Sequence, residues 1–254
     1  MFVACSTLCF SREPLEAALR HIAELEFNKI DLAIVEDGQH LRPSEVAENP
    51  EAALHRIRQG PSLTPVALDL DFGAVEAKLY RRRFEAMCRL AKPLMVAVLT
   101  IPAAPAGTAL DDEVRRLATL NEIARREGLV LTLATNAETL TADPATAAGL
   151  CRAVPGLGLT LDPSHYLQGP HGGAGFEEVY PYVQHVHFRD TGKGPGEFQV
   201  RVGQGEIEYG RIISQLERHG YKRSLTVSIL DRIENPFRNE VEVRKLKLLL
   251  ESLI

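Results

Sequence analysis

The chain has 254 residues, of which 45% are hydrophobic and 25% are charged, and its formal net charge is −5. The length and composition suit one large globular α/β domain. The acidic balance argues against a nucleic-acid partner or an anionic membrane surface, because phosphate groups favour a basic surface.

We expect no targeting or membrane-spanning segment in this sequence. The opening apolar stretch, "MFVACSTLCF", has no basic residue before it, and no run approaches the roughly 20 apolar residues of a membrane-spanning helix. The four cysteines, at positions 5, 9, 88 and 151, form no CxxC pair. We therefore expect reduced thiols and a cytoplasmic protein.

Short β-rich runs alternate with helical patterns along the whole chain. Strands are predicted over residues 2–6, 29–34, 64–70, 94–100, 129–135, 158–162, 183–189 and 224–230. Helices are predicted over residues 14–26, 44–60 with a break at Pro50, 74–91, 110–128, 143–154, 208–220 and 239–253. Only a short helix fits residues 169–181, so we expect the sixth unit to be distorted.

Eight strand–helix units without a linker predict a single (β/α)8 barrel domain over residues 1–254. The competing fold is an open doubly wound sheet. That fold usually carries a glycine-rich phosphate loop after its first strand, and "CSTLCFSRE" contains no such loop.

Ionisable side chains gather where the predicted strands end, which is the catalytic face of such barrels. They are Glu36, Asp37, His40, Asp69, Asp71, Asp162, His165, His185, His187, Arg189, Asp190, Asp231 and Glu234. Carboxylates and neutral imidazoles together suit a divalent transition metal. A histidine at a strand end is more often an ordinary hydrogen-bonded residue, and Asp-Pro-Ser is a common turn starter, so both interpretations stay open.

Strand parity sharpens the metal interpretation. His185, His187 and Arg189 alternate with Val186 and Phe188 in "HVHFR". The apolar pair should face the helices, which leaves the imidazoles and the guanidinium facing the barrel axis.

"LTLDPSHY", "HVHFRD" and "VGQGEIEYGRIISQLERHGY" resemble the sugar phosphate isomerase/epimerase group of xylose isomerase-like TIM barrels. The resemblance is strongest from the fifth to the eighth strand. It implies one divalent metal (Mn, Co, Zn or Mg) held at the ends of strands five to eight, and no nucleotide cofactor. Asp162 and His187 match two of the ligand positions, and His165 would join the metal or face the substrate.

The resemblance implies two further ligands, both glutamates, that also act as the acid/base pair. This chain reads "LTLATN" and "LTVSIL" there, which places Ala134 and Ser228 at the two positions. Proton transfer beside a carbonyl needs a base within hydrogen-bond reach, which alanine cannot supply. We therefore expect a weakened metal site, with His165 and Arg189 as the catalytic candidates.

Further ligand contacts are expected from the other polar side chains near the strand ends and from the glycine-rich loop after strand seven. The substrate-binding candidates are Glu36, His40, Asp69, His185, Gln204 and Asp231. The backbone of residues 203–205 or Arg189 would meet substrate oxygens or a phosphate.

Three functions remain open. The first is an isomerase or epimerase of a small sugar, sugar phosphate or cyclitol. The second is a catalytically inactive relative that binds a sugar-like ligand as a sensor or partner subunit. The third and remotest is an AP endonuclease-like hydrolase, which would need many more metal ligands and a basic surface for DNA.

Two smaller features complete the prediction. Ser228 has no G-x-S-x-G turn around it, so a small barrel-filling residue is favoured over a hydrolase nucleophile. The last helix, "VRKLKLLLESLI", carries an apolar stripe that should close the barrel and could support a homodimer.

Overall fold

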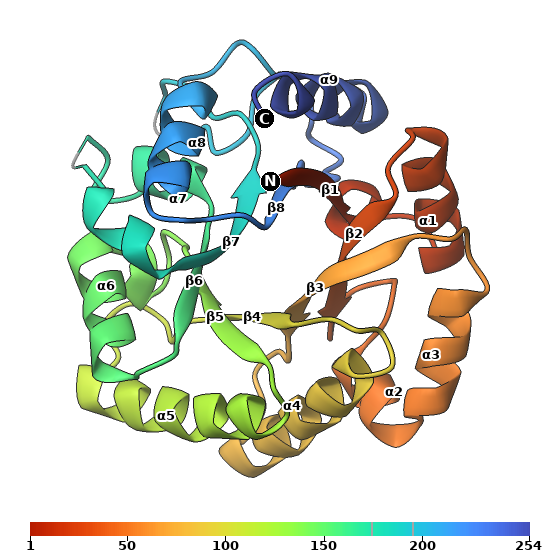
Figure 1. Ribbon diagram of the computed structural model, residues 1–254, viewed down its shortest axis with the longest axis vertical. Helices are drawn as coiled ribbons and strands as arrows, with labels where there is room; N and C mark the ends of the chain where they lie inside the picture. Colours follow the sequence, from red (N-terminus) through yellow and green to blue (C-terminus); the bar gives the residue numbers. More distant parts are fainter. Residues whose placement is uncertain (174, 195) are drawn as a thin grey trace.

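Eight parallel strands form a closed barrel in chain order, and β8 pairs with β1 to complete it. The computed structural model describes residues 1–173, 175–194 and 196–254. Figure 1 shows the strands at the centre and the helices as an outer ring. The strands are β1 Phe2–Ser6, β2 Lys29–Val35, β3 Thr64–Asp71, β4 Val98–Pro102, β5 Val130–Ala134, β6 Gly158–Leu161, β7 Val183–Phe188 and β8 Ser224–Val227.

The helices connect successive strands on the outside of the barrel. The α-helices are α1 Leu15–Glu24, α2 Pro43–Glu48, α3 Pro50–Arg58, α4 Ala77–Ala91, α5 Leu110–Arg126, α6 Pro144–Ala153, α7 Pro163–Gln168, α8 Tyr209–Arg218 and α9 Asn239–Glu251. Short 3-10 helices are η1 Thr7–Phe10, η2 Leu140–Ala142 and η3 Glu177–Tyr182. None of the helices described combines the length and apolar character needed to cross a membrane.

The (β/α)8 prediction is confirmed, and its errors lie at element ends. The fourth strand was expected over 94–100 but is Val98–Pro102, because Met95 adopts a left-handed backbone (φ 56°) and the Val96 amide bonds back to Ala91, ending α4. Pro50 separates two helices as predicted. The sixth unit is distorted as expected, with only the six-residue α7 and η3; position 174 between them lies outside the described residues.

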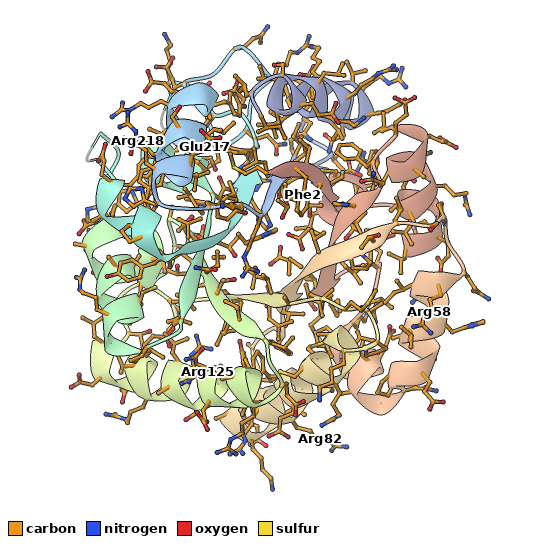
Figure 2. All side chains as sticks on the ribbon, in the orientation of Figure 1. Phe2, Arg58, Arg82, Arg125, Glu217 and Arg218 are labelled. Carbon is orange, nitrogen blue, oxygen red and sulfur yellow. The ribbon has the colours of Figure 1, made fainter. Side chains whose placement is uncertain are left out.

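The two faces of the strands bury different chemistry. Residues facing the helices are apolar, and they include Val186 and Phe188, as parity predicted. Residues facing the axis are largely polar: the hydroxyls of Thr100, Thr132 and Thr160 lie 2.8–3.1 Å from one another in the barrel interior. Charged residues on the outer helices, such as Arg58 and Arg82, point away from the barrel (Figure 2). The polar interior is therefore built separately from the apolar layer that holds the fold together.

Candidate functional site

A cavity of about 380 Å³ lies over the carboxyl ends of the strands; we call it the mouth cavity. Its volume falls in the range of small-molecule sites. The lining residues are Leu8, Val35, Asp69, Leu70, Asp71, Pro102, Ala134, Thr135, Asn136, Thr160, Asp162, His165, His187, Arg189, Ser228 and Leu230. Two other hollows lie between outer helices, and a third lies among α7, η3 and α8. The side chains at the strand ends line the mouth cavity, so it is the candidate site.

Asp162 ends β6 and caps α7. Its Oδ1 accepts hydrogen bonds from the Ser164 amide (3.0 Å) and hydroxyl (2.6 Å), which satisfies the start of the helix. Its Oδ2 forms an ion pair with Nη2 of Arg189 at 2.8 Å. Burial acts to raise the pKa of Asp162, but Arg189, His165 and the Ser164 hydroxyl outweigh it and lower the pKa, so the carboxylate stays ionised.

His165 lies between Arg189 and the backbone of the loop after β5. Its Nε2 is 2.8 Å from Nη2 of Arg189, and its Nδ1 is 3.2 Å from the Ala137 amide. Burial, only partly offset by Asp162, lowers the pKa of His165 to about 4. The ring is therefore neutral near pH 7. Only one of its two nitrogens accepts a hydrogen bond in a given tautomer, so the Ala137 amide and Arg189 cannot both donate to it at once.

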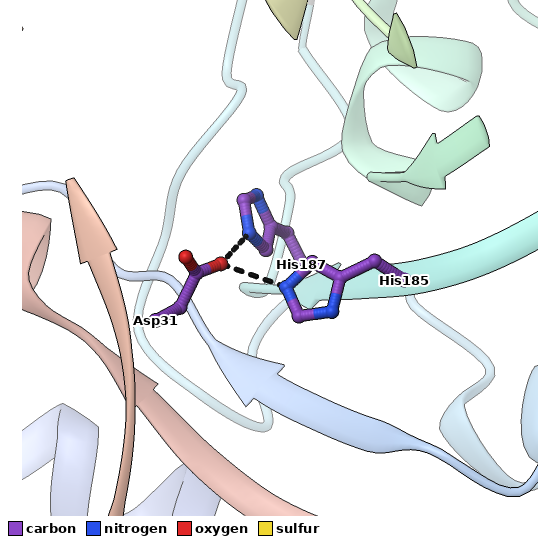
Figure 3. A group of neighbouring side chains, drawn as sticks. All are labelled: Asp31, His185 and His187. Carbon is purple, nitrogen blue, oxygen red and sulfur yellow. Dashed lines mark hydrogen bonds and ion pairs between the residues drawn. The ribbon is translucent and has the colours of Figure 1, made fainter. Parts of the chain in front are cut away.

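Three buried side chains meet beneath the mouth cavity, inside the barrel. Oδ2 of Asp31 on β2 accepts hydrogen bonds from Nε2 of His185 (2.7 Å) and Nε2 of His187 (2.6 Å), both on β7. Figure 3 shows the two rings converging on this one oxygen, with the second nitrogen of His187 on the far side of its ring. Asp31 is completely buried, and its Oδ1 has no hydrogen-bond partner among the described residues.

The trio divides its charges unequally. Burial acts to raise the pKa of Asp31, but the two histidines hold that pKa below its usual range. Burial opposes protonation of His187, yet its hydrogen bond to Asp31 raises the pKa of His187 to about 9. Burial lowers the pKa of His185. At neutral pH the trio is a carboxylate, one imidazolium and one neutral imidazole.

Asp69 is the carboxyl group of the mouth cavity with the most perturbed environment. Burial raises the pKa of Asp69 to about 7, since the opposing effect of His187 is offset by Asp31 and Asp71. A carboxyl group that titrates near neutral pH can both give and take a proton there.

The residues at the mouth do not fit the metal that the resemblance implies. Asp162 and His165 direct ligand atoms at Arg189 rather than at a shared vacancy, and Ala134 has no donor atom. Nε2 of His187 donates a hydrogen bond to Asp31, and the raised pKa of about 9 means that a metal binding this ring would first have to displace a proton.

Asp31, His185 and His187 form a second group that could hold a metal, because one ligand atom from each lies within 4.8 Å of the others. In the structure, however, the carboxylate oxygen is only 2.6–2.7 Å from either nitrogen. Ligands of one ion with bonds of about 2.0–2.2 Å usually lie about 3 Å or more apart. The arrangement is that of a hydrogen-bonded charge cluster, which would have to open to admit an ion.

The structure brings together only part of the predicted site. Asp162, His165, His187 and Arg189 line the mouth cavity, together with Ala134 and Ser228. Of the six predicted substrate-binding residues, only Asp69 lines this cavity among the residues the structure describes. His185 lies deeper, bound to Asp31.

The other predicted contacts hold loops in place. Glu36 forms an ion pair with Arg83 at 3.1 Å. His40 is buried, with Nε2 3.2 Å from the Phe10 carbonyl oxygen. Asp231 accepts a 2.9 Å hydrogen bond from Nε of Arg12.

The glycine-rich loop after β7 folds around its own aspartate. Oδ2 of Asp190 accepts hydrogen bonds from the amides of Gly203 (2.8 Å) and Gly205 (3.1 Å), so these amides do not point at a ligand oxygen. Gln204 is exposed on the surface of this loop. Position 195, in the same loop, lies outside the described residues.

Sequence reasoning missed Asp31. A signal was present, because Asp31 is the one charged residue within the apolar run "IDLAIV" of a buried strand. An aspartate in such a run is almost never fully buried unless it is paired. Asp31 therefore required cationic or hydrogen-bonding partners inside the barrel, although its sequence could not say which.

Comparisons with known proteins agree with this architecture. The family model described as xylose isomerase-like TIM barrel matches residues 19–248. A search of curated protein sequences found no match. D-allulose 3-epimerase from Methylomonas sp. is 15% identical, with 100% of this chain and 98% of that chain covered and a TM-score of 0.77.

Two further solved structures are similar. A probable 3-DHS dehydratase from Bacillus anthracis is 16% identical over 99% of both chains, with a TM-score of 0.75. A xylose isomerase-like TIM barrel protein from Mycobacterium smegmatis, in complex with magnesium, is 16% identical over 99% of this chain and 97% of that one, with a TM-score of 0.75. At these sequence identities the similarity shows a shared fold. The chemistry of this protein has to be argued from its own site residues.

Proposed function

The chain belongs to the xylose isomerase-like TIM barrel family, and we propose that it binds a small sugar, sugar phosphate or cyclitol in the mouth cavity. We further propose that this binding does not use a metal-bound pair of carboxylates. The epimerase and dehydratase among its structural neighbours support a small oxygenated ligand as the class to test first.

The observation that carries this proposal is the composition of the mouth cavity. Its wall offers carboxyl groups from Asp69 and Asp71, the side-chain amide of Asn136, and the hydroxyl of Ser228. Such groups pair with the many hydroxyls of a sugar, each of which both donates and accepts. The volume of about 380 Å³ suits a ligand of one sugar ring.

The same wall lacks the proton-transfer pair that the resemblance implies. Ala134 and Ser228 contribute a methyl and a hydroxyl group at the ends of β5 and β8. A serine without an adjacent base is a poor acid or base. Specific binding without the family's glutamate chemistry is the function that these side chains support best.

A second candidate function is isomerisation or epimerisation by a relocated acid/base group. The specific observation in its favour is Asp69, whose pKa of about 7 and position on the cavity wall suit proton transfer at neutral pH. In this reading Asp69 would remove or return a proton on a ligand carbon beside a carbonyl.

One experiment addresses both candidates. Purified protein is screened by calorimetry against ketoses, inososes and their phosphates, in buffer with EDTA, and each ligand that binds is then incubated in D2O and followed by proton NMR. Binding with EDTA present supports the first proposal. Deuterium uptake that disappears in Asp69→Asn supports the second.

A steric block supplies the matched control. Ala134→Phe would fill the mouth cavity without removing a hydrogen bond, whereas Ala52→Phe adds the same ring to an exposed position of α3. We expect the first variant to abolish binding and the second to leave it unchanged. Equal binding by both variants, or no binding across the panel, would contradict the proposed site.

A further inference from the structure

We propose that Arg189 is the resident cation of the mouth cavity, and that its guanidinium occupies the position where a divalent metal would bridge Asp162 and His165. The proposal depends on the proposed function only in treating the mouth cavity as the ligand site. It is tested by metal binding, whereas the proposed function is tested by sugar binding, so each can fail alone.

The distances place the guanidinium in the gap between two ligand atoms. Oδ2 of Asp162 and Nε2 of His165 are 3.8 Å apart, and Nη2 of Arg189 lies 2.8 Å from each. Two ligands of one ion with bonds of about 2.0–2.2 Å lie at most about 4.4 Å apart. The carboxylate and the imidazole are thus spaced as two ligands of one ion would be, and the arginine nitrogen lies between them.

The guanidinium is fixed there by the chain itself. Nε of Arg189 donates to the Ser164 hydroxyl at 2.8 Å, and that hydroxyl donates to Oδ1 of Asp162 at 2.6 Å. Arg189 is 3% exposed and Asp162 is 8% exposed. A guanidinium keeps its charge at every physiological pH, so an ion entering this gap would meet a permanent buried positive charge.

The position of Arg189 in the chain explains why its guanidinium lies at the mouth cavity. Arg189 directly follows β7 and comes two residues after His187, and both side chains line the mouth cavity. Asp162 meets them from the neighbouring strand β6. A metal could bind between Asp162 and His165 only if the guanidinium moved away. The positive charge of Arg189 would then be buried without its partner carboxylate, which is unfavourable.

The arrangement also assigns a role toward the ligand. No hydrogen bond joins Nη1 of Arg189 to another of the described residues, while Nε and Nη2 are both engaged. Arg189 is one of the residues that line the mouth cavity. A carbonyl or carboxylate oxygen of the ligand is the group that this donor would bind, in the way that a metal would otherwise bind it.

The test introduces glutamates at positions 134 and 228 and compares metal binding in the presence and in the absence of Arg189. Mn²⁺ binding is measured by calorimetry and elemental analysis for Ala134→Glu/Ser228→Glu and for Ala134→Glu/Ser228→Glu/Arg189→Ser. We expect one Mn²⁺ per triple variant and binding about 100-fold weaker in the double variant, because only the triple variant has emptied the gap. Dissociation constants within about threefold of each other would overturn the proposal.

Two controls keep the test decisive. Arg211→Ser in the same double variant removes an arginine from an exposed ion pair with Glu177, and should leave Mn²⁺ binding as weak as in the double variant. If the triple variant does not fold, Arg189→Gln replaces Arg189→Ser, because it removes the charge and keeps much of the volume. An unchanged Mn²⁺ affinity in that variant would equally overturn the proposal.

Discussion

Nε2 of His187 donates a 2.6 Å hydrogen bond to Oδ2 of Asp31, which joins β7 to β2 across the interior of the barrel. The two residues are 156 positions apart in the chain, and Asp31 is completely buried. The bond holds the Nε2 edge of the His187 ring, and Nδ1 lies on the far side of the ring (Figure 3). The same oxygen also accepts a hydrogen bond from His185. The charge of His187 therefore depends on Asp31, which does not line the mouth cavity.

Asp31→Asn should lower the pKa of His187 from about 9 and destabilise the protein at pH 7. Removing one partner of a buried ion pair costs about 3–5 kcal/mol. The raised pKa means that the stabilisation is complete below the unfolded value of 6.5 and is lost as the pH rises through about 9. Histidine NMR titrations and urea unfolding between pH 6 and 10 measure both effects.

The control for this prediction is Asp37→Asn, which removes an exposed carboxylate from the loop after β2. It should leave the pH profile of the parent unchanged. If Asp31→Asn and the parent lost stability in parallel between pH 6 and 10, the ion pair would not be the source of the pH dependence.

Asp69→Asn should stabilise the protein at pH 8 and change little at pH 4. The folded state holds the Asp69 proton up to a pKa of about 7, whereas the unfolded chain releases it near 3.8, so stability falls as the pH rises between these values. Asn cannot ionise and avoids this loss. We expect a gain of about 1–2 kcal/mol at pH 8, discounted for partial solvent access.

Urea unfolding of Asp69→Asn and the parent at pH 4, 6 and 8 checks that prediction. Asp37→Asn, which removes an exposed carboxylate from the loop after β2, serves as the matched substitution. A gain that is equally large at pH 4 would mean that packing, rather than ionisation, separates the variants.

Gly205→Ala should destabilise the loop after β7. A methyl group at this position would overlap the Asp190 carboxylate and the Thr191 carbonyl oxygen. Overpacking of this kind costs about 1–3 kcal/mol. Gly210→Ala, at the start of α8, meets nothing nearer than 4.0 Å and should instead gain up to about 1 kcal/mol. Thermal melts of the two variants should shift in opposite directions, and equal shifts would argue against the close approach.

Thr132→Val should lower the free energy of unfolding, although valine and threonine have nearly the same shape. The Thr132 hydroxyl lies 3.1 Å from the Leu99 carbonyl oxygen and 2.8 Å from the Thr160 hydroxyl. Leaving buried polar partners unsatisfied costs about 1–3 kcal/mol. Thr119→Val, at an exposed helix position, should cost less in the same urea unfolding measurement, and an equal cost would contradict a special role for the interior hydroxyls.

Much of the candidate site followed from local pattern. Alternation in "HVHFR" correctly placed His187 and Arg189 on the axis side and Phe188 in the apolar layer. The end of "LTLD" correctly placed Asp162 at the mouth of the barrel. These inferences worked because the two-residue period of a strand fixes which side chains share a face, whatever the rest of the chain does.

Pairing between strands could not be derived in the same way. Asp31 meets His187 only because the barrel closes and places β2 across the interior from β7. Arg189 meets Asp162 only because β6 and β7 are paired neighbours. The replacement of two glutamates at Ala134 and Ser228 stays a prediction from the resemblance. Nothing in the sequence indicated that the guanidinium of Arg189 would lie beside Asp162 and His165.

By itself the sequence determined the eight alternating units and the polar face of strand seven, because these depend on periodicity within single segments. The tertiary structure alone decided which charges neutralise one another. Burial removes water from Asp31, Asp162 and their partners, and only the register and closure of the barrel determine which counter-charge lies within hydrogen-bond distance.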